Sequence, residues 1–339
     1  AMKYLADHEI TLTRKIRLII GTDEENGWRD LPRYFEVEGE PTMGFSPDGA
    51  FPVVNGEKAF QTVQLRFANQ TTGDYVLRRF IAGSRPNVVP GEARARVSVP
   101  NPAQVQNEFA TYLAQYPFLS GQSEVRDQEV RLLLKGVQAH GAYPQDGENA
   151  GTYLANFLRR FAFNADAKTF LDFIGRVVHD DIGAENLGLR YHDDVMGDLT
   201  LNVGVMRFSQ NGQGTILLNF RYPQGVNIQA VTTQVQRHLG DFAATVEVWP
   251  GGMEPHLVPE TDELVGTLSL VYAKQTGMYM NPRTSNGGSY ARLLKRGVAF
   301  GGQFPDVPVT SHQANESTPV ANLTRSMAIF AESLLKLAK

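Results

Sequence analysis

The order of apolar and polar residues predicts two kinds of sheet in this chain. Lys15–Ile20 is an apolar run with basic flanks and β-branched residues, which is typical of a buried parallel strand. Farther along, apolar and polar residues alternate at Val63–Phe67, Tyr75–Ile81 and Ala93–Val99, as they do in antiparallel strands. The two patterns indicate two different structural units.

The middle of the chain combines strands with helices. The pattern predicts an amphipathic helix from Pro102 to about Tyr116, a strand over Glu129–Gln138, and a hairpin of Leu199–Phe208 and Thr215–Arg221. Strand-strand-helix units of this kind favour an α+β domain with an antiparallel sheet. Pro250-Gly251-Gly252 marks its predicted end, because glycine and proline interrupt regular structure.

The last part of the chain returns to the first pattern, with a predicted helix over Asp262–Gln275, a buried strand at Val298–Phe300 and a helix over Pro319–Leu337. A length of 339 residues exceeds what one core ordinarily holds. We therefore predict an α/β fold in which residues 1–57 and 256–339 form one domain with a mainly parallel sheet. Residues 58–255 are predicted to form an α+β domain, with an antiparallel sheet, inserted into it.

Charge and composition narrow the range of partners. The 32 Lys and Arg residues against 36 Asp and Glu residues give a net charge of −4, without a basic stripe, which argues against nucleic acid and anionic membranes. No apolar run reaches the roughly 18 residues of a membrane span. The chain has no cysteine, so any metal must be held by histidine and carboxylate, and we expect the protein in the cytoplasm.

Paired carboxylates follow the first predicted strand. Glu24 and Glu25 are adjacent in Gly21-Thr22-Asp23-Glu24-Glu25, and two such groups at a strand end repel each other unless a cation or a proton lies between them. A solvated acidic turn is the alternative. Asp48, in Pro47-Asp48-Gly49, is either a turn residue or a further carboxylate brought to the same sheet edge. The three carboxylates together favour a divalent metal.

Five motifs occur in order and together resemble a known enzyme family. They are Gly-Thr-Asp-Glu-Glu-x-x-Trp at 21–28, Pro-Asp at 47–48, Ala-His-Gly at 139–141, Gly-Gly-x-Tyr-Ala-Arg at 287–292 and His-Gln-x-Asn-Glu at 312–316. This set resembles the co-catalytic zinc peptidases of the aminoacylase and carnosinase type, and most of all the bacterial dipeptidase V group. The resemblance covers essentially the whole chain.

The resemblance implies a catalytic α/β domain with two zinc ions and an inserted lid domain. It implies that Glu24 is the general base, that Glu25 and His312 ligate one zinc, and that Asp48 ligates the other. Two zinc ions would activate a shared water and polarise the scissile carbonyl, while a carboxylate moves the proton to the leaving amine. Cobalt or manganese are alternatives to zinc, because ligands of this kind accept all three.

Further roles follow from the resemblance. His140 would hold the tetrahedral oxyanion, Asn87 and Arg221 would contact substrate, and the amides of Gly287 and Gly288 would approach the substrate carboxylate. The residues by themselves leave alternatives open: a structural histidine, a turn asparagine, a solvated strand-end arginine and a glycine turn.

One departure from the family concerns the metal ligands. The family has a His-x-Asp histidine and a bridging aspartate before the Glu-Glu pair, and residues 1–23 contain neither. The His-x-Asp match at His192-Asp193-Asp194 lies in the inserted domain and is interpreted as a solvated loop. Ala1–Ala6 reads like the inside of a helix. We therefore expect an N-terminally shortened family member with an incomplete metal site.

These interpretations predict a zinc-dependent enzyme that hydrolyses unsubstituted dipeptides, including those with an amino-terminal β-alanine or a carboxy-terminal histidine. The expected assembly is a monomer or a homodimer. One alternative is an amidohydrolase acting on N-acyl amino acids, and another is a catalytically inactive fragment or binding protein. The chain lacks both a Gly-x-Ser-x-Gly elbow and a His-Glu-x-x-His helix, which argues against those hydrolase classes.

Overall fold

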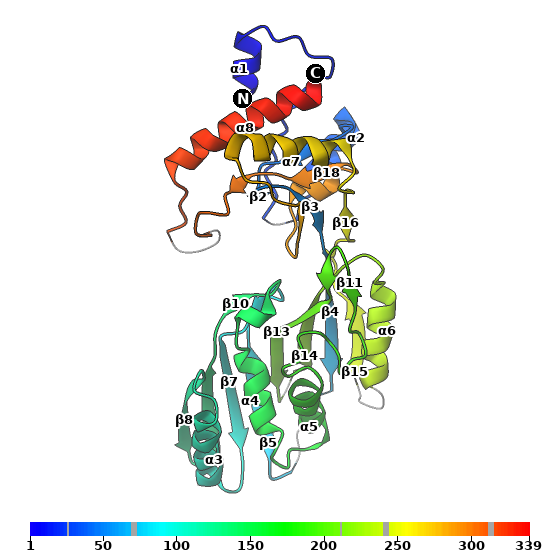
Figure 1. Ribbon diagram of the computed structural model, residues 1–339. Helices are drawn as coiled ribbons and strands as arrows, with labels where there is room; N and C mark the ends of the chain where they lie inside the picture. The colour runs from blue at the N-terminus through cyan, green and yellow to red at the C-terminus, as the bar shows by residue number, and fades with distance from the viewer. Residues whose placement is uncertain (26, 69–72, 211, 240–243, 311–314) are drawn as a thin grey trace. The chain divides into compact units, whose positions relative to one another are not determined.

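The computed structural model describes residues 1–25, 27–68, 73–210, 212–239, 244–310 and 315–339 (Figure 1). The chain divides into two compact units. The first consists of Ala1–Lys58 and Pro255–Lys339, and the second of Ala59–Glu254. Both contain helices and sheets, which confirms the mixed α/β class. No helix in the described part of the chain is long and apolar enough to cross a membrane.

The second unit is built on an eight-stranded antiparallel sheet, as the alternating pattern predicted. The strand order is β15-β4-β14-β13-β5-β7-β9-β8, and every neighbouring pair is antiparallel. The strands are β4 (Ala59–Phe67), β5 (Val76–Ala82), β7 (Glu92–Ser98), β8 (Ser120–Arg126), β9 (Glu129–Lys135), β13 (Thr200–Ser209), β14 (Gly214–Tyr222) and β15 (Ala244–Val248).

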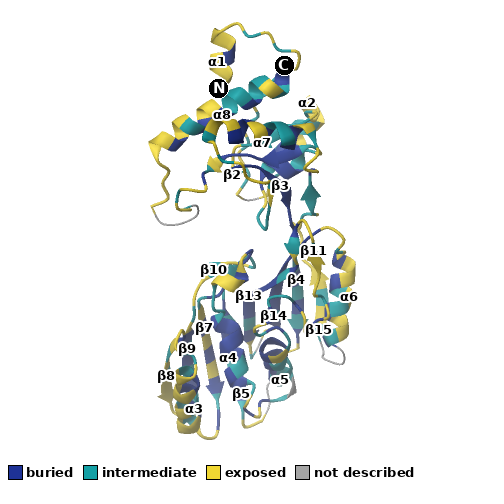
Figure 2. Ribbon diagram, in the orientation of Figure 1, coloured by how far each residue is buried: buried dark blue, intermediate teal, exposed yellow. Residues whose placement is uncertain are grey.

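Helices cover one face of this sheet and complete its core. They are α3 (Pro102–Ala114), α4 (Ala150–Leu158), α5 (Ala165–Asp172), the π-helix η2 (Phe173–Val177) and α6 (Ile228–Leu239). Buried side chains of the strands and of these helices form one apolar cluster, which Figure 2 shows in dark blue along β13, β14 and α4. Alternate residues of β4 are buried in it, because successive side chains of a strand point to opposite faces.

Two short strand pairs and a 3₁₀ turn complete the second unit. β6 (Val88–Val89) pairs with β10 (Ala139–His140), and β11 (His192–Asp193) pairs with β12 (Gly197–Asp198). The 3₁₀ helix η1 (Pro144–Asp146) precedes α4. Asn149 begins α4, since its Oδ1 accepts the amides of Gly151 and Thr152 at 3.1 and 3.3 Å.

The first unit has a five-stranded mixed sheet, so the prediction of a mainly parallel sheet is wrong for the described residues. Its strands are β1 (Gly44–Ser46), β3 (Val54–Glu57), β16 (His256–Leu257), β17 (Arg283–Ser285) and β18 (Gly297–Ala299). β1 is parallel to β18 and β17 to β3, whereas β18 and β16 are antiparallel to β3. The chain leaves the unit along β3 and re-enters along β16, and strands that lead out and back in this way pair antiparallel.

Helices pack on this sheet around a second apolar core. The helices are α1 (Met2–Asp7), α2 (Asp30–Glu38), α7 (Glu263–Thr276) and α8 (Val320–Ala338), with the 3₁₀ helix η3 (Tyr290–Leu293). The core joins Phe51 and Phe300 of the sheet region to Leu268 of α7 and Ile329 of α8. Two further short strands of this unit, β2 (Gly49–Ala50) and β19 (Gly302–Gln303), form a separate parallel pair. Each unit therefore has its own core.

The predicted strand at Lys15–Ile20 is not formed. This segment has no regular structure, and the side chains of Leu18 and Ile20 are 68% and 80% exposed. No strand in the described ranges pairs with it, and a strand needs a partner for its backbone groups. The segment instead lines a groove of about 910 Å³ together with β1 and α8.

Candidate active site

The loop that carries Glu24 and Glu25 is held by a partly buried network of hydrogen bonds in the first unit. The Oδ2 atom of Asp30 accepts the Thr22 amide at 2.6 Å and the Asp23 amide at 3.1 Å. The Tyr290 hydroxyl donates to the same oxygen at 2.7 Å and accepts the Asp23 amide at 2.9 Å. Two residues that are far apart in the sequence therefore fix the start of this loop.

The charges of this network are consistent with its hydrogen bonds. Burial acts to raise the pKa of the Asp30 carboxyl, but hydrogen bonds from the Thr22 amide and the Tyr290 hydroxyl outweigh it and hold the pKa below its usual value. Burial, with the hydrogen bond to Asp30, raises the pKa of Tyr290 to about 12. The tyrosine thus stays protonated and donates to an ionised aspartate at neutral pH.

The rest of the loop folds back on itself. The Trp28 indole donates to the Glu24 carbonyl oxygen, and the Trp28 ring lies edge-on to Tyr290 at 5.9 Å between ring centroids. A Cβ on Gly21 would lie 2.3 Å from the Tyr290 ring, so only glycine fits at the start of the loop. The main chain around Glu24 is therefore confined on both sides.

Asp23 is committed to a structural contact. Its Oδ2 accepts the Arg29 amide at 3.1 Å and Arg29 Nε at 2.9 Å, and the Arg29 contacts hold the pKa of the Asp23 carboxyl below its usual range. Glu24 is partly exposed and Glu25 is exposed. Asp23 and Glu24 are thus both partly accessible to solvent, and Glu25 is the most accessible of the three.

A buried charge cluster anchors the Gly287-Gly288 loop. Glu57, at the end of β3 and 3% exposed, accepts the Ser289 amide at 3.0 Å and the Ser289 hydroxyl at 2.6 Å. The Arg292 guanidinium lies 3.7 Å from the same carboxylate and donates to the Lys58 carbonyl at 3.2 Å. These contacts fix the loop to the end of β3.

The electrostatics of this cluster connect it to Asp48. Burial raises the pKa of Glu57, and the charge of Asp48 acts in the same direction, while the Ser289 and Arg292 contacts oppose it. Asp48 itself is exposed, in the turn between β1 and β2. A Cβ on Gly288 would lie 3.1 Å from the Trp28 ring. The structure therefore brings the loop that carries Glu24 next to the Gly287-Gly288 loop in the first unit.

The expected metal ligands are described only in part. Glu25 and Asp48 supply carboxylate oxygens, but His312 lies outside the described residues. In the ranges that the structure describes, no group of three or more His, Cys, Asp or Glu side chains could hold a metal ion. The roles of Glu25, Asp48 and His312 as metal ligands therefore stay a prediction.

His140 and Asn87 lie next to each other in the second unit. Gly141 donates its amide to the Asn87 carbonyl at 2.7 Å, and His140 pairs with Val88 across β10 and β6. The Ala142 amide donates to His140 Nδ1 at 3.2 Å. Because Nδ1 is the acceptor, the neutral ring carries its proton on Nε2 and can donate from there.

Arg221 lies near the end of β14 in the same unit and is 6% exposed. Its Nε donates to Asn219 Oδ1 at 3.2 Å, and its guanidinium lies 4.9 Å from the centroid of the Phe60 ring. The alternative of a solvated strand-end arginine is therefore wrong. A buried arginine of this kind is a candidate for binding an anionic group.

The His192-Asp193-Asp194 motif is a surface feature, as expected. The side chain of His192 is 62% exposed and its Nδ1 lies 2.8 Å from Asp198 Oδ1 across the short β11–β12 pair. Nothing links it to the residues of the candidate site in the described part of the second unit.

Sequence reasoning did not identify Glu57, Asp30 or Asn202 as contributors. Glu57 lies at the end of a short strand in which every residue is buried, but the sequence Val-Asn-Gly-Glu does not reveal this burial. Asp30 and Asn202 had no signal either, since their partners lie on other segments of the chain.

Comparison with known proteins places these residues in context. The sequence profile described as peptidase family M20/M25/M40 matches residues 1–336. A β-Ala-Xaa dipeptidase of Lactobacillus delbrueckii subsp. lactis is 39% identical over 328 residues, which is 96% of this chain and 69% of that protein. A candidate dipeptidase of Staphylococcus haemolyticus is 37% identical over 342 residues, which is 99% of this chain and 72% of that protein.

One solved structure aligns with most of this chain. It is an M20 family metallo-carboxypeptidase of Sulfolobus solfataricus, which aligns with 99% of this chain and 73% of its own length at 16% identity and a TM-score of 0.49. The profile match and the two sequence relatives confirm the resemblance that the five motifs indicated. The chain belongs to peptidase family M20/M25/M40.

Proposed function

We propose that this protein is a dipeptidase that cleaves unsubstituted dipeptides with Glu24 as the general base. The observation that carries the proposal is the link between two loops of the first unit. The Tyr290 hydroxyl joins the Glu24–Glu25 loop to the segment that follows Gly287 and Gly288. The proposed proton acceptor, Glu24, and the two glycines proposed to approach the substrate are thereby linked through Tyr290.

Glu24 has the properties of a general base. Its main chain is fixed by Trp28, and its side chain is partly exposed, so a water molecule has access to it. In the proposed reaction the carboxylate takes a proton from the attacking water and gives it to the leaving amine. Its neighbour Glu25 is assigned a different role, as a metal ligand.

We propose Glu25, Asp48 and His312 as ligands of zinc, with cobalt or manganese as alternatives. Carboxylate and imidazole donors suit these metals, and the chain has no cysteine that could replace them. A bound metal would lower the pKa of a water and polarise the substrate carbonyl. The family membership supports metal dependence.

The second unit is proposed to act as a lid that contributes substrate contacts. His140 would donate from Nε2 to the developing oxyanion, because its Nδ1 already accepts the Ala142 amide. Arg221 would bind the terminal carboxylate of the dipeptide or the oxyanion, and Asn87 would contact substrate. Gly287 and Gly288 of the first unit would present backbone amides to the carboxylate, and the Gly287 amide would exchange its 2.9 Å hydrogen bond to Ser285 Oγ for one to the substrate.

The proposed substrates are dipeptides with an amino-terminal β-alanine or a carboxy-terminal histidine. The dipeptidase relative from Lactobacillus is named for β-Ala-Xaa substrates, and the five motifs match the carnosinase type. We also propose a cytoplasmic location and a monomeric or homodimeric assembly. The absence of a long apolar run and of cysteine in the sequence supports the first of these.

A comparison of two substrates tests the proposal. The purified protein, supplied with zinc, is incubated with β-alanyl-histidine or with N-acetyl-alanine, and the release of amino acids is followed by chromatography. We expect the dipeptide to be cleaved at least about 10-fold faster, with loss of activity after chelation and recovery with zinc. Faster cleavage of the N-acyl substrate would instead support the amidohydrolase alternative. Binding of the dipeptide without turnover would support an inactive binding protein.

A further inference from the structure

Two buried asparagines lie opposite each other in the sheet of the second unit. Asn202 of β13 pairs with Asn219 of β14, and Asn219 pairs in turn with Thr62 of β4. The asparagines are 2% and 3% exposed. Leu201 and Val203, on either side of Asn202, belong to the apolar core. Since strand residues alternate between faces, the asparagines lie on the face away from that core.

Asn202 holds the turn that contains Asn87. Its Nδ2 donates to the Pro86 carbonyl at 2.7 Å and to the Val88 carbonyl at 3.1 Å, one on each side of Asn87. Both partners are carbonyl oxygens, so the amide nitrogen and not the oxygen must face them. A buried amide would be costly to leave unpaired, and here both of its hydrogens are used.

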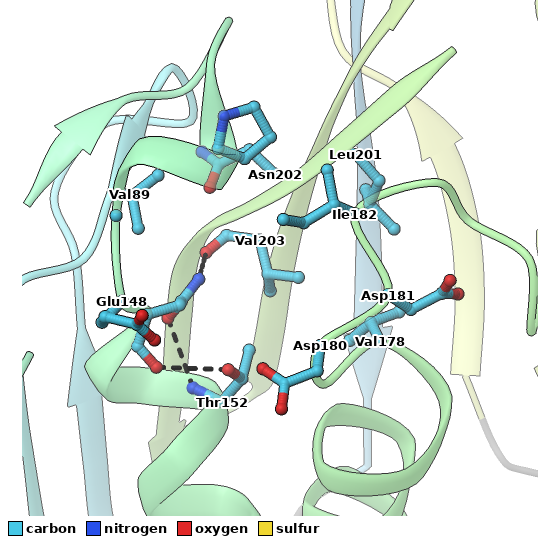
Figure 3. A pocket seen from close by; sticks show the side chains of 13 residues that line it. Val89, Glu148, Thr152, Val178, Asp180, Asp181, Ile182, Leu201, Asn202 and Val203 are labelled. Atoms are coloured by element: carbon cyan, nitrogen blue, oxygen red, sulfur yellow. Dashed lines mark hydrogen bonds between the residues drawn. The ribbon is translucent and has the colours of Figure 1, made fainter. Parts of the chain in front are cut away.

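The same asparagine contacts the segment of His140 indirectly, through the turn that contains Asn87. The Gly141 amide donates to the Asn87 carbonyl at 2.7 Å, and His140 pairs with Val88. A Cβ on Gly141 would lie 2.8 Å from Asn202 Nδ2, so the two segments are in close contact. Figure 3 shows Asn202 with Val89 and Val203 at the edge of a cavity of about 60 Å³. The position of His140 therefore depends on Asn202.

Asn219 performs the corresponding function for Arg221. Its Oδ1 accepts Arg221 Nε at 3.2 Å, while its Nδ2 donates to Thr62 Oγ1 at 3.1 Å. The threonine thus fixes the orientation of the amide, and the amide fixes one nitrogen of the guanidinium. Arg221 is two residues along the same strand, so both side chains lie on the same face.

We propose that Asn202 and Asn219 are positioning residues of the peptidase reaction. One cross-strand pair sets the positions of Asn87, His140 and Arg221, the three substrate-contacting residues assigned to the second unit. This inference rests on the proposed function for its kinetic consequences. Its structural part, the fixing of the two segments by Asn202, is independent of any activity.

The first test uses a substitution that preserves the size of the side chain. In Asn202→Asp an acceptor oxygen replaces the donor and faces two carbonyl oxygens, which repel it. We expect kcat for β-alanyl-histidine to fall at least about 10-fold, because a misplaced catalytic donor loses this much or more. The Gly141 amide, followed by hydrogen-exchange NMR, should exchange at least about 10-fold faster as its segment is released. In Asn202→Ser one donor is kept without repulsion, and both effects should be smaller.

Asn219→Ala separates the two roles. Arg221 would lose its orienting acceptor while His140 keeps its position, so we expect KM to rise about 10-fold with kcat within about 2-fold. Exchange at Gly141 should stay unchanged. The matched control is Asn186→Asp, which breaks a hydrogen bond from Nδ2 to the Val177 carbonyl elsewhere in the unit. It should alter neither kinetic constant.

Three results would overturn the inference. They are unchanged Gly141 exchange in Asn202→Asp, equal kinetic losses in Asn202→Asp and Asn186→Asp, and a loss of kcat that follows only the folded fraction. If the unsubstituted protein does not cleave the dipeptide, the proposed function fails. The exchange measurement then decides whether Asn202 holds the two segments.

Discussion

Single side chains in this protein connect segments that are distant in the sequence. Tyr290 lies in a motif that sequence reasoning noticed, but its partners Asp30 and Asp23 are at the other end of the chain. The motif singles out Tyr290 in the sequence, but it does not show which residues Tyr290 contacts. The hydrogen bonds show that Tyr290 supports the loop of the proposed base.

Removal of that hydroxyl should affect both stability and turnover. In Tyr290→Phe we expect a loss of about 1 kcal/mol in the free energy of unfolding, because the Asp23 amide and Asp30 lose a partner. We expect kcat to fall about 10-fold as the loop loosens. Urea unfolding and dipeptide kinetics check this. Tyr279→Phe is the control, since Tyr279 is 85% exposed, and equal effects in both variants would contradict the role of Tyr290.

The Glu57–Arg292 pair gives a second prediction at this scale. Both side chains are almost fully buried, so truncating either removes the opposite charge from beside a buried group. We expect Glu57→Ala and Arg292→Ala each to destabilise the protein by about 3 kcal/mol. The double variant should lose clearly less than the sum, because neither charge remains. Strict additivity in urea unfolding would show that the pair is not coupled.

At the scale of elements, the hydrophobic pattern predicted those strands in which buried and exposed residues alternate. The antiparallel sheet of the second unit is confirmed, and its strands β4 and β7 show the expected alternation of more and less buried residues. Lys15–Ile20 has the composition of a strand and does not form one, since pairing depends on a partner and not on the segment itself. The direction of β16 against β3 was equally invisible in the sequence.

The start of α7 gives a prediction for pH. Asp262 caps this helix by accepting the Leu264 amide at 2.8 Å, and Arg296 donates to both of its oxygens at 2.9 and 2.8 Å. Arg296 lowers the pKa of the Asp262 carboxyl in the folded protein. The group therefore adds stability above its unfolded pKa of about 4, and this contribution is lost as the pH falls further.

The measurement compares two proteins across this range. The free energy of unfolding is determined between pH 3 and pH 7 for the unsubstituted protein and for Asp262→Asn, which keeps an acceptor for the cap. We expect the difference between them to shrink as the pH falls below about 4. Arg33→Met is the control, because Arg33 belongs to an exposed pair with Glu36. A difference that stays constant with pH would contradict the assigned coupling.

The whole molecule consists of two units, each with its own apolar core. The interruption of one sheet pattern by another in the sequence predicts such an organisation. The chemistry was less accessible, because Glu57, Asp30 and Asn202 act through partners that only folding brings close. The motifs predict which residues react, and the structure shows which side chains contact the loops that carry those residues.

The central claim is that Glu24 is the general base of a dipeptidase. The most direct measurement is kcat for β-alanyl-histidine in the zinc-supplied protein and in Glu24→Gln, with the zinc content of both determined. We predict that kcat falls by about 10² to 10⁴-fold while the zinc content is unchanged, because the amide cannot accept the proton. Glu25→Gln should instead lower the zinc content. Full activity in Glu24→Gln, or no dipeptide cleavage by the zinc-supplied protein, would contradict the claim.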